Sequence, residues 1–333
     1  MKLLTNPADI DRTQWQALAD RSPVASIFQT SEMYDFYHGL QLYKTALCAV
    51  EECGTIKGLV LCPIQSEGRG VKGRLTARAI INGGPLLDAD ISTEALGALL
   101  KTTISILRQR CIYIETRNLN DYSRWRKVFE KCGFSYSPHY NFHIDTSDPT
   151  QVDRRIDKSR RRRIRRATEA GAVLSNDTTH LPAFYNILSD LYHKKIHKPL
   201  PPYSLFARLT ELPFARYFFV LDPQGKVIGG QLILMLGQRI GYAWYCCGLD
   251  REYHDLYPSI MANYAAIRYA TNHGFERYDM MGAGKPDEDY GVRDFKAQFG
   301  GTLVEHGRFL HVNNRVIYHL GKQALNLLKK IKG

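Results

Sequence analysis

The chain has 333 residues, a length that predicts about two domains, and its 44% hydrophobic and 23% charged residues are typical of a folded soluble protein. No apolar run approaches the ~20 residues of a membrane span, and the N-terminus lacks the apolar stretch of a signal peptide. Seven cysteines without a CxxC pair argue against a disulfide framework or a zinc ribbon. We therefore expect a reduced, cytoplasmic protein with a formal net charge of +12.

The first half predicts a mixed α/β domain. Strand-like residues at 42–51 and 56–65 flank a tight Cys53-Gly54 turn, which indicates a hairpin. The breaker Asn82-Gly83-Gly84-Pro85 follows a short apolar run. After it we expect a helix at 92–110, a strand at 111–116, a helix at 121–131 and a closing strand at 134–144.

The polar segment 146–150 (TSDPT) is the predicted domain boundary. We expect a first domain at 1–147, a second at 150–312 and a C-terminal helix in 313–333 that packs back on the body. One side of that helix is apolar, through Ile317, Leu320, Leu327, Leu328 and Ile331. The alternative is a basic amphipathic helix that lies on a membrane surface.

The densest charge lies just after this boundary, where residues 154–166 read RRIDKSRRRRIRR. Between Gln151 and Gly171 nine Lys/Arg stand against three acids, a local charge of +6. The spacing predicts one helix, begun by Thr150 and ended by Gly171. Its core-facing seam would be formed by Val152, Ile156, Ser159, Arg163, Ala167 and Ala170.

Arginine forks match phosphate oxygens, so an RNA, a nucleotide pyrophosphate or an anionic lipid headgroup is the expected partner of this helix. We assign the binding to Arg161, Arg162, Arg165 and Arg166. The alternative is a solvated charged helix or a nonspecific membrane-surface patch.

The rest of the second half repeats the order of the first. After a helix at 181–196 we expect a hairpin of 216–221 and 226–236, a third strand at 239–247, a helix at 258–272 and a strand at 275–281. Each half thus carries a meander, a helix, a strand, a helix and another strand.

Sequence motifs within these elements reduce the number of folds that fit this order. YDMMGAGKPDEDYGVRDFKAQFGG, residues 278–301, resembles the signature of the Fem-type aminoacyltransferases: a strand, a glycine turn, and G-x-x-x-F-K-x-x-F-G. The arginine segment resembles the family's R-x-x-x-R-R-x-x-R-x-A-x-x-x-G, and YHKKIHKPLPPYSLF resembles the stretch after it. IFQTSEMYDF and NGGPLL in the first half are weaker matches. The resemblance spans roughly residues 12 to 310.

The resemblance implies two tandem GNAT-like acyltransferase domains of the α/β (α+β) class, with mixed central sheets flanked by helices and facing each other across a cleft. The coiled-coil arm that some members insert is absent. It also implies transfer of an amino acid from an aminoacyl-tRNA to an amine of a cell-wall precursor. By resemblance, Phe295 and Lys296 belong to the site, where the ammonium would lie near the oxyanion or the donor phosphates. No cofactor or metal is implied.

Other residues are candidates by type and position. Asp279, at a strand end, is expected either to orient the incoming amine or to cap the glycine turn. Tyr242, Trp244 and Tyr245 alternate along a strand and would line a groove or the core. His193, Lys194 and His197 suit a basic lip for phosphates better than a metal site with Asp190. Tyr257 and His254 precede a helix as acid/base groups or turn residues.

Two departures from the family pattern bear on the substrates. REYHDLYPS occupies the place of the glycine-rich turn that cradles the pyrophosphate of acetyl-CoA, which counts against CoA as donor. SEMYDFYH has Tyr34 at the tryptophan position of S-x-x-W and no Lys or Arg after it, so the acceptor stays open as a nucleotide-linked or lipid-linked precursor. No nucleophile or phosphate-loop motif is present, which favours direct attack.

Two rival functions remain from the sequence. One is a CoA- or carrier-dependent N-acyltransferase acting on an envelope sugar or amine. The other is a non-catalytic RNA- or membrane-binding protein. A location at the inner face of the membrane, with peripheral contact, is compatible with the basic charge, and the sequence specifies no oligomeric state.

Overall fold

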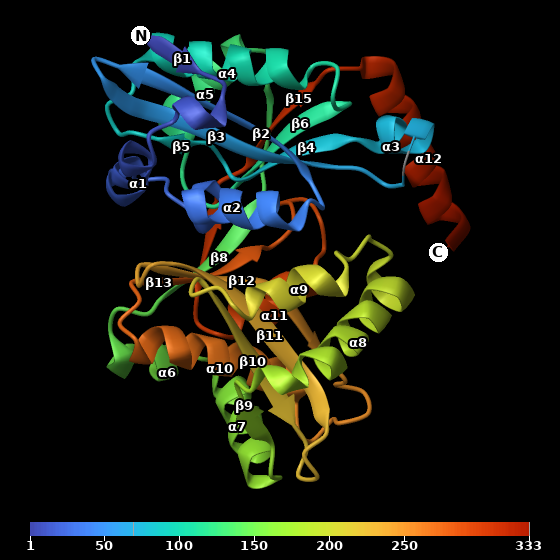
Figure 1. The fold of residues 1–333 in the computed structure, drawn as a ribbon. Helices are drawn as coiled ribbons and strands as arrows, with labels where there is room; N and C mark the ends of the chain where they lie inside the picture. Colours follow the sequence, from blue (N-terminus) through green and yellow to red (C-terminus); the bar gives the residue numbers. More distant parts are fainter. Residues whose placement is uncertain (69, 333) are drawn as a thin grey trace. The chain divides into compact units, whose positions relative to one another are not determined.

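The computed structural model describes the backbone of residues 1–68 and 70–332 and the side chains of residues 1–68 and 70–323. The chain forms two compact units, one of residues 1–139 with 305 onward and one of residues 140–304. Each unit is built on its own β-sheet with helices on both faces, as Figure 1 shows. The predicted fold class, two mixed sheets flanked by helices, is confirmed.

The first unit has the strand order β1-β2-β3-β4-β6-β15-β7, with β5 paired to β3. Its helices α4 and α5 cover one face of the sheet, and α1 and α2 cover the other (Figure 1). The elements are β1 (Lys2–Leu4), η1 (Pro7–Asp9), α1 (Arg12–Arg21), η2 (Ile27–Gln29), α2 (Ser31–Leu40), β2 (Lys44–Glu52), β3 (Thr55–Gln65), α3 (Gly70–Thr76), β4 (Arg78–Gly83), β5 (Leu86–Leu87), α4 (Thr93–Leu107), β6 (Tyr113–Asn118), η3 (Ser123–Trp125), α5 (Arg126–Lys131), β7 (Ser135–Ser137), β15 (Arg308–Val312) and α12 (Arg315–Lys332).

The core of the first unit lies between α4 and the sheet. Leu96, Leu99 and Leu100 of α4 are fully buried in the cluster that contains the inward residues of β2 and β3. The predicted breaker is a real turn: Gly84 has φ +81, and a Cβ there would lie 2.5 Å from the Tyr122 ring. The Tyr122 hydroxyl bonds the turn through the carbonyl oxygens of Gly83 and Pro85.

The second unit has the strand order β14-β8-β13-β12-β11-β10-β9. Helix α10 packs on one face with α6 and α7 against it, and α8 packs on the other (Figure 1). The elements are β8 (Tyr140–Asp145), α6 (Pro149–Arg155), α7 (Lys158–Glu169), β9 (Val173–Ser175), η4 (Thr178–His180), α8 (Leu181–Leu191), the π-helical turn η5 (Tyr192–Ile196), α9 (Tyr203–Leu209), β10 (Ala215–Leu221), β11 (Val227–Leu236), β12 (Ile240–Gly248), α10 (Pro258–Asn272), β13 (Arg277–Gly282), α11 (Gly291–Ala297) and β14 (Thr302–Glu305).

The predicted repeat of architecture is confirmed. The order β2-β3-β4, α4, β6, α5, β7 in the first unit recurs as β10-β11-β12, α10, β13, α11, β14 in the second. The central helix has the predicted bounds in the second unit, where Ala262, Ala266, Ile267 and Ala270 are fully buried against the sheet.

The units differ from the expected residue ranges because two strands are exchanged. The expected closing strand at 134–144 is two strands: β7 stays in the first sheet, whereas β8 pairs with β13 in the second. In return β15, reached through β14, pairs with β6 and β7 of the first sheet. The chain therefore passes into the second unit at residue 140 rather than at 147–150, and returns at 305 rather than ending the second unit at 312.

The single helix expected over the arginine segment is also two helices. Ile156 is extended, and the Asp157 carboxylate caps a new helix by accepting the N–H groups of Ser159 and Arg160. Three residues of the predicted seam, Val152, Ile156 and Ala167, are buried, whereas Ser159, Arg163 and Ala170 are not. In α7 the buried face is Arg160, Ile164 and Ala167, because the new start shifts the helical phase. Gly171 ends the helix with φ +85, as predicted.

Helix α12 begins on the first unit. The Asn313 side chain donates to the carbonyl oxygens of Leu107 and Cys111, and the Tyr318 ring lies 5.5 Å from that of Tyr113. Val316 and Leu320 are exposed. The side chains of Leu327, Leu328 and Ile331 lie outside the described residues, so packing of this helix on the body stays a prediction. Over the described residues, every helix is too short or too polar to traverse a bilayer.

Candidate active site

The site begins where two parallel strands separate. Strands β12 and β13 pair only from Ile240 to Tyr242 and from Arg277 to Asp279. Beyond this point β12 stays with β11 as far as Gly248, and β13 carries an extra residue between its pairings with β8 at Asp279 and Gly282. The carbonyl groups of residues 280–282 consequently lie past the last rung shared with β12 and need other donors.

Lys296 supplies those donors. Its ammonium bonds the carbonyl oxygens of Met280, of Gly282 at 2.8 Å and of Met281 at 3.4 Å. The lysine stands on the short helix α11, held by the buried ring of Phe299 and the partly buried ring of Phe295, whose centroids are 5.4 Å apart. The glycine turn and the F-K motif thus form one constellation, and the surface-lysine alternative does not describe it.

The surroundings of Lys296 lower the affinity of its amine for a proton. Burial lowers the pKa of Lys296 to about 8, and the nearby Asp279 carboxylate opposes that shift. Burial also raises the pKa of the Cys246 thiol to about 12, so the thiol stays protonated beside the lysine. The lysine is therefore mostly charged at neutral pH but loses its proton in the mildly alkaline range.

Asp279 lies beneath the turn rather than at its surface. Its side chain is completely buried; Oδ1 accepts the Met281 N–H at 2.6 Å, and Oδ2 lies 3.2 Å from His143 Nε2. Met281 itself has φ +60, a conformation that a non-glycine residue adopts at a cost of order 1 kcal/mol. The geometry supports the turn-capping interpretation, with Asp279 acting on Lys296 through its charge.

The aromatic residues of β12 are one buried and two partly buried side chains. Trp244 is the extra residue of a β-bulge, since Ala243 pairs with Ile233 and Tyr245 with Leu232. Its partly buried ring lies 5.0 Å from that of Tyr245. Tyr242, which we expected to contact substrate, is fully buried in the core and is withdrawn from the site.

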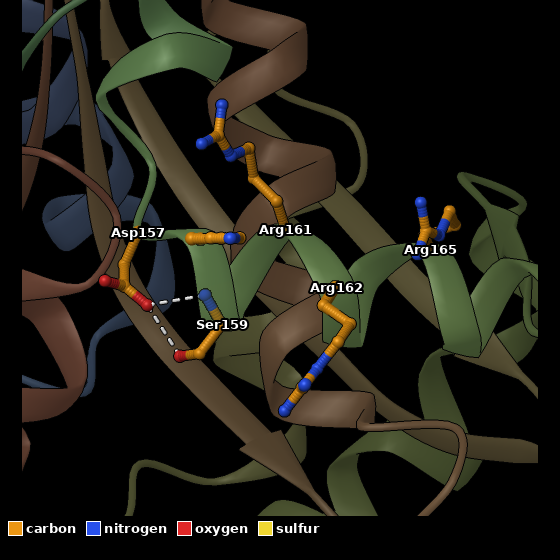
Figure 2. Close-up of a pocket in the computed structure, with 6 residues that line it drawn as sticks. Asp157, Ser159, Arg161, Arg162 and Arg165 are labelled. Atoms are coloured by element: carbon orange, nitrogen blue, oxygen red, sulfur yellow. Dashed lines mark hydrogen bonds between the residues drawn. The ribbon is translucent and has the colours of Figure 1, made fainter.

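The exposed side of α7 carries the predicted arginines. Figure 2 shows Asp157 with its capping bonds to Ser159, and Arg161, Arg162 and Arg165 extending from the helix beyond them. Together these residues line an open pocket of about 720 Å³. Arg166 pairs with Asp255 at 3.3 Å, and Arg165 lies 3.6 Å from Glu169. Exposed pairs of this kind are weak, so a phosphate can displace them.

Arg160 is a functional candidate that the sequence analysis missed. Its side chain is buried, with the guanidinium 4.5 Å from the Phe295 ring centroid and 4.8 Å from that of Phe299. The signal was present in the helical spacing of Arg160, Ile164 and Ala167, which becomes readable only when Asp157 is taken as the helix start.

The remaining candidates lie on η5 and around the start of α10. His193, Lys194 and His197 are exposed on and after η5, and Lys194 pairs with Asp190 at 2.7 Å. Tyr257 precedes α10 with φ +43, and its ring lies 5.9 Å from the Arg163 guanidinium. No metal-binding group of His, Cys, Asp or Glu side chains occurs among the residues that the structure describes.

The first turn of α10 is occupied by the chain itself. The Asp250 carboxylate accepts the Ser259 N–H at 3.0 Å and the Ser259 hydroxyl proton. A side chain on Gly248 would lie 2.5 Å from Ser259 Oγ, so strand, loop and helix are tightly packed here. A carboxylate thus fills the helix end that would otherwise attract a phosphate.

Comparison with known proteins bears on this geometry. A model of the FemAB family matches residues 208–327. The lipid II:glycine glycyltransferase of Staphylococcus epidermidis is 32% identical over 116 residues, 33% of this chain and 27% of that protein. The crystal structure of FemX superposes with a TM-score of 0.73 at 17% identity, covering 96% of this chain and 99% of that one. A tandem GNAT protein from the clavulanic acid biosynthesis pathway gives 0.59 at 13% identity, covering 94% and 98%.

The two kinds of match carry different information. The structural matches confirm the tandem fold over nearly the whole chain. The family-model match falls on the part that contains α10, β13 and α11, where the F-K motif lies. The chain spans about a quarter of the length of the curated relative, 27%, so the activity of that whole protein does not transfer directly.

Proposed function

We propose that this chain, a Fem-type member of the GNAT superfamily, is an amide-forming aminoacyltransferase that moves an amino acid from an aminoacyl-tRNA to an amine of a lipid-linked peptidoglycan precursor. The observation that carries the proposal is the opening between β12 and β13 with the Lys296 ammonium inside it. A relative named lipid II:glycine glycyltransferase supports the acceptor class.

The chemistry asks little of the protein beyond positioning and charge. The acceptor amine attacks the ester carbonyl carbon of the donor, a C–N bond forms, and the carbonyl oxygen becomes an oxyanion. The ester C–O bond then breaks, and the ribose oxygen leaves with the proton that the amine loses. Lys296 stabilises the oxyanion, and its long 3.4 Å bond to the Met281 oxygen is the one that a substrate oxygen replaces.

In this proposal the exposed arginines of α7 bind the anionic part of a substrate. Arg161, Arg162 and Arg165 line one pocket in the same unit as Lys296, so they suit the phosphates of the tRNA or of the lipid-linked precursor. A location at the inner face of the membrane follows from such an acceptor and is part of the proposal.

The filled end of α10 counts against the CoA-dependent rival. Acetyl-CoA enzymes need free backbone N–H groups at this helix start, and Asp250 already accepts the Ser259 N–H there. A pyrophosphate would have to displace a carboxylate and would meet its charge.

The deciding experiment is a single-turnover assay with two donors. The protein is mixed with a lipid-linked, amine-bearing peptidoglycan precursor and either radiolabelled aminoacyl-tRNA or a radiolabelled acyl-CoA. We expect label on the acceptor amine only from the tRNA. Transfer from acyl-CoA alone would establish the rival, and binding without any transfer would establish a non-catalytic protein.

Salt dependence tests the arginine pocket separately. The affinity for tRNA should fall with salt by about one log-log unit per phosphate contact. Changing Arg161, Arg162, Arg165 and Arg166 to Gln should flatten that slope, whereas Arg208→Gln, on an exposed arginine of α9 paired with Glu211, should leave it unchanged. Equal slopes in all three proteins would mean that α7 is only a solvated face.

A further inference from the structure

Arg160 joins the arginine helix to the helix that carries Lys296. The guanidinium lies against the rings of both Phe295 and Phe299, and Nη2 donates to the Phe295 carbonyl oxygen at 3.2 Å. The residue is 2% exposed, whereas its neighbours Arg161 and Arg162 are exposed. An arginine turned inward within a run of outward arginines has a different task from the rest.

The surroundings of Arg160 are unusual for a buried cation. Its Nε is buried without a hydrogen-bond partner, and no carboxylate lies within ion-pair distance in the described part of the chain. Burial and the nearby Arg163 lower the pKa of the guanidinium to about 10, and the carboxylates of Asp157 and Asp250, beyond ion-pair distance, oppose that shift. Burying a cation without an ion pair destabilises a fold, so an apolar side chain of similar size would be more stable here. The contact of the guanidinium with two aromatic faces therefore indicates a function other than stability.

Two backbone contacts flank this stack. The Asp157 N–H, at the start of α7, donates to the Gln298 carbonyl oxygen at 3.0 Å, just after α11. Gly300 lies so close to the backbone of Arg155 that a Cβ there would be 2.4 Å from its carbonyl oxygen. The start of α7 and the end of α11 are therefore packed together, and Lys296 lies in the last turn of α11.

We propose that Arg160 is a positioning residue for Lys296, which holds α11 so that the ammonium reaches the opening between β12 and β13. The titratable groups near that ammonium are the Asp279 carboxylate of β13 and the neutral Cys246 thiol of β12, so Arg160 acts through the position of α11 rather than through its charge. The inference rests on the proposed function only for the meaning of Lys296 in transfer.

The test measures Lys296 itself and needs no acceptor. Trace acetylation with acetic anhydride over a pH series, read by mass spectrometry, gives the midpoint at which the Lys296 amine becomes reactive. In the parent we expect a midpoint near 8. In Arg160→Met a loosened α11 lets water reach the ammonium, and the midpoint rises by about one pH unit or more toward the ordinary lysine value.

Turnover and anion binding should separate in the same variant. Single-turnover transfer should fall roughly tenfold to a hundredfold, as for a displaced catalytic group, while the salt slope of tRNA binding stays at the parental value. Arg160→Lys keeps the charge without the planar face and should restore little. Ile164→Ala, which weakens the same helix through a residue that is not part of the aromatic stack, should leave the Lys296 midpoint unchanged.

If Arg160→Met does not fold, Phe295→Leu and Phe299→Leu remove the ring faces and should raise the midpoint in the same direction. A parental Lys296 midpoint in the folded variants, or full restoration by Arg160→Lys, would overturn the proposal. A raised midpoint in a protein whose parent transfers nothing would support the positioning role of Arg160 and refute the proposed function.

Discussion

In each unit two neighbouring strands share only a few residue pairs, and the gap beside them is filled by different side chains. In the first unit β3 and β4 share only two rungs, at Ile64 and Gln65, and the side chain of Gln29 fills the gap. Its Nε2 donates to the carbonyl oxygens of Leu61 and Asn82, and its Oε1 accepts the Leu61 N–H, each at 2.9 Å. In the second unit the separation falls between β12 and β13, and Lys296 fills it.

The two side chains that fill these gaps, Gln29 and Lys296, differ in burial, charge and hydrogen-bonding capacity. Gln29 is fully buried and neutral, and its amide both donates and accepts. It therefore replaces the backbone hydrogen bonds that the separated strands do not make with each other. Lys296 is partly exposed and charged, only donates, and has a pKa lowered by burial. In the first unit, moreover, the parallel strands β4 and β6 pair over six residues with no opening. The comparison therefore supports the proposal that the transfer reaction takes place in the second unit.

The largest expected effect follows from removing the Lys296 ammonium. Lys296→Met should lower single-turnover transfer by at least about a hundredfold, the usual result of losing an oxyanion donor, with a much smaller change in substrate binding. Rapid-quench transfer and equilibrium binding measure the two quantities. A variant with parental turnover would remove Lys296 from the mechanism.

The same substitution has a signature in stability. The folded pKa of about 8 lies below the 10.5 of an unfolded lysine, so the unfolded chain binds more protons between these values. The free energy of unfolding of the parent should gain a contribution that rises with pH from about 8 to 10.5. Denaturation series across that range should show the rise in the parent and lack it in Lys296→Met.

Changing Gln29 should lower the stability of the fold without lowering the transfer rate of the folded protein. Gln29→Leu leaves the Leu61 amide and two carbonyl groups buried without partners, which should cost about 3 kcal/mol or more of unfolding free energy. Transfer per folded molecule should equal that of the parent. Denaturant melts together with active-site-normalised rates decide this, and a catalytic loss without loss of stability would break the comparison.

The smallest effect, a shift in the pH dependence of the rate, is expected from changing Asp279, which lies near Lys296. Asp279→Asn keeps an oxygen for the Met281 N–H but removes the charge that holds the pKa of Lys296 up, so that pKa should fall below about 8. Because the protonated lysine is the active form, the rate is full below its pKa and is lost above it. The alkaline limb of a pH–rate profile should consequently move to lower pH, and an unmoved limb would mean that Asp279 acts only as a turn cap.

The sequence predicted what is local and failed where partners are distant. The repeat of elements and helix α10 are short-range patterns, and they are confirmed. The glycine turn and Lys296 do lie in contact, and the catalytic role of Phe295 and Lys296 stays a prediction. The pairing of β8 with β13 was out of reach because its alternating pattern suits either sheet equally. Arg160 was lost among outward arginines because one residue of helical phase, set by the cap at Asp157, decides which side chain turns inward.

The strand exchange has a consequence for synthesis on the ribosome. The slot between β6 and β7 is filled by β15, whose Phe309 is buried and stacks at 4.1 Å on Phe129. A nascent chain that has reached residue 147 has every other strand of its first sheet but exposes two unpaired edges and an incomplete core. The half of the protein that is made first is therefore completed last, after the whole of the second unit has left the ribosome.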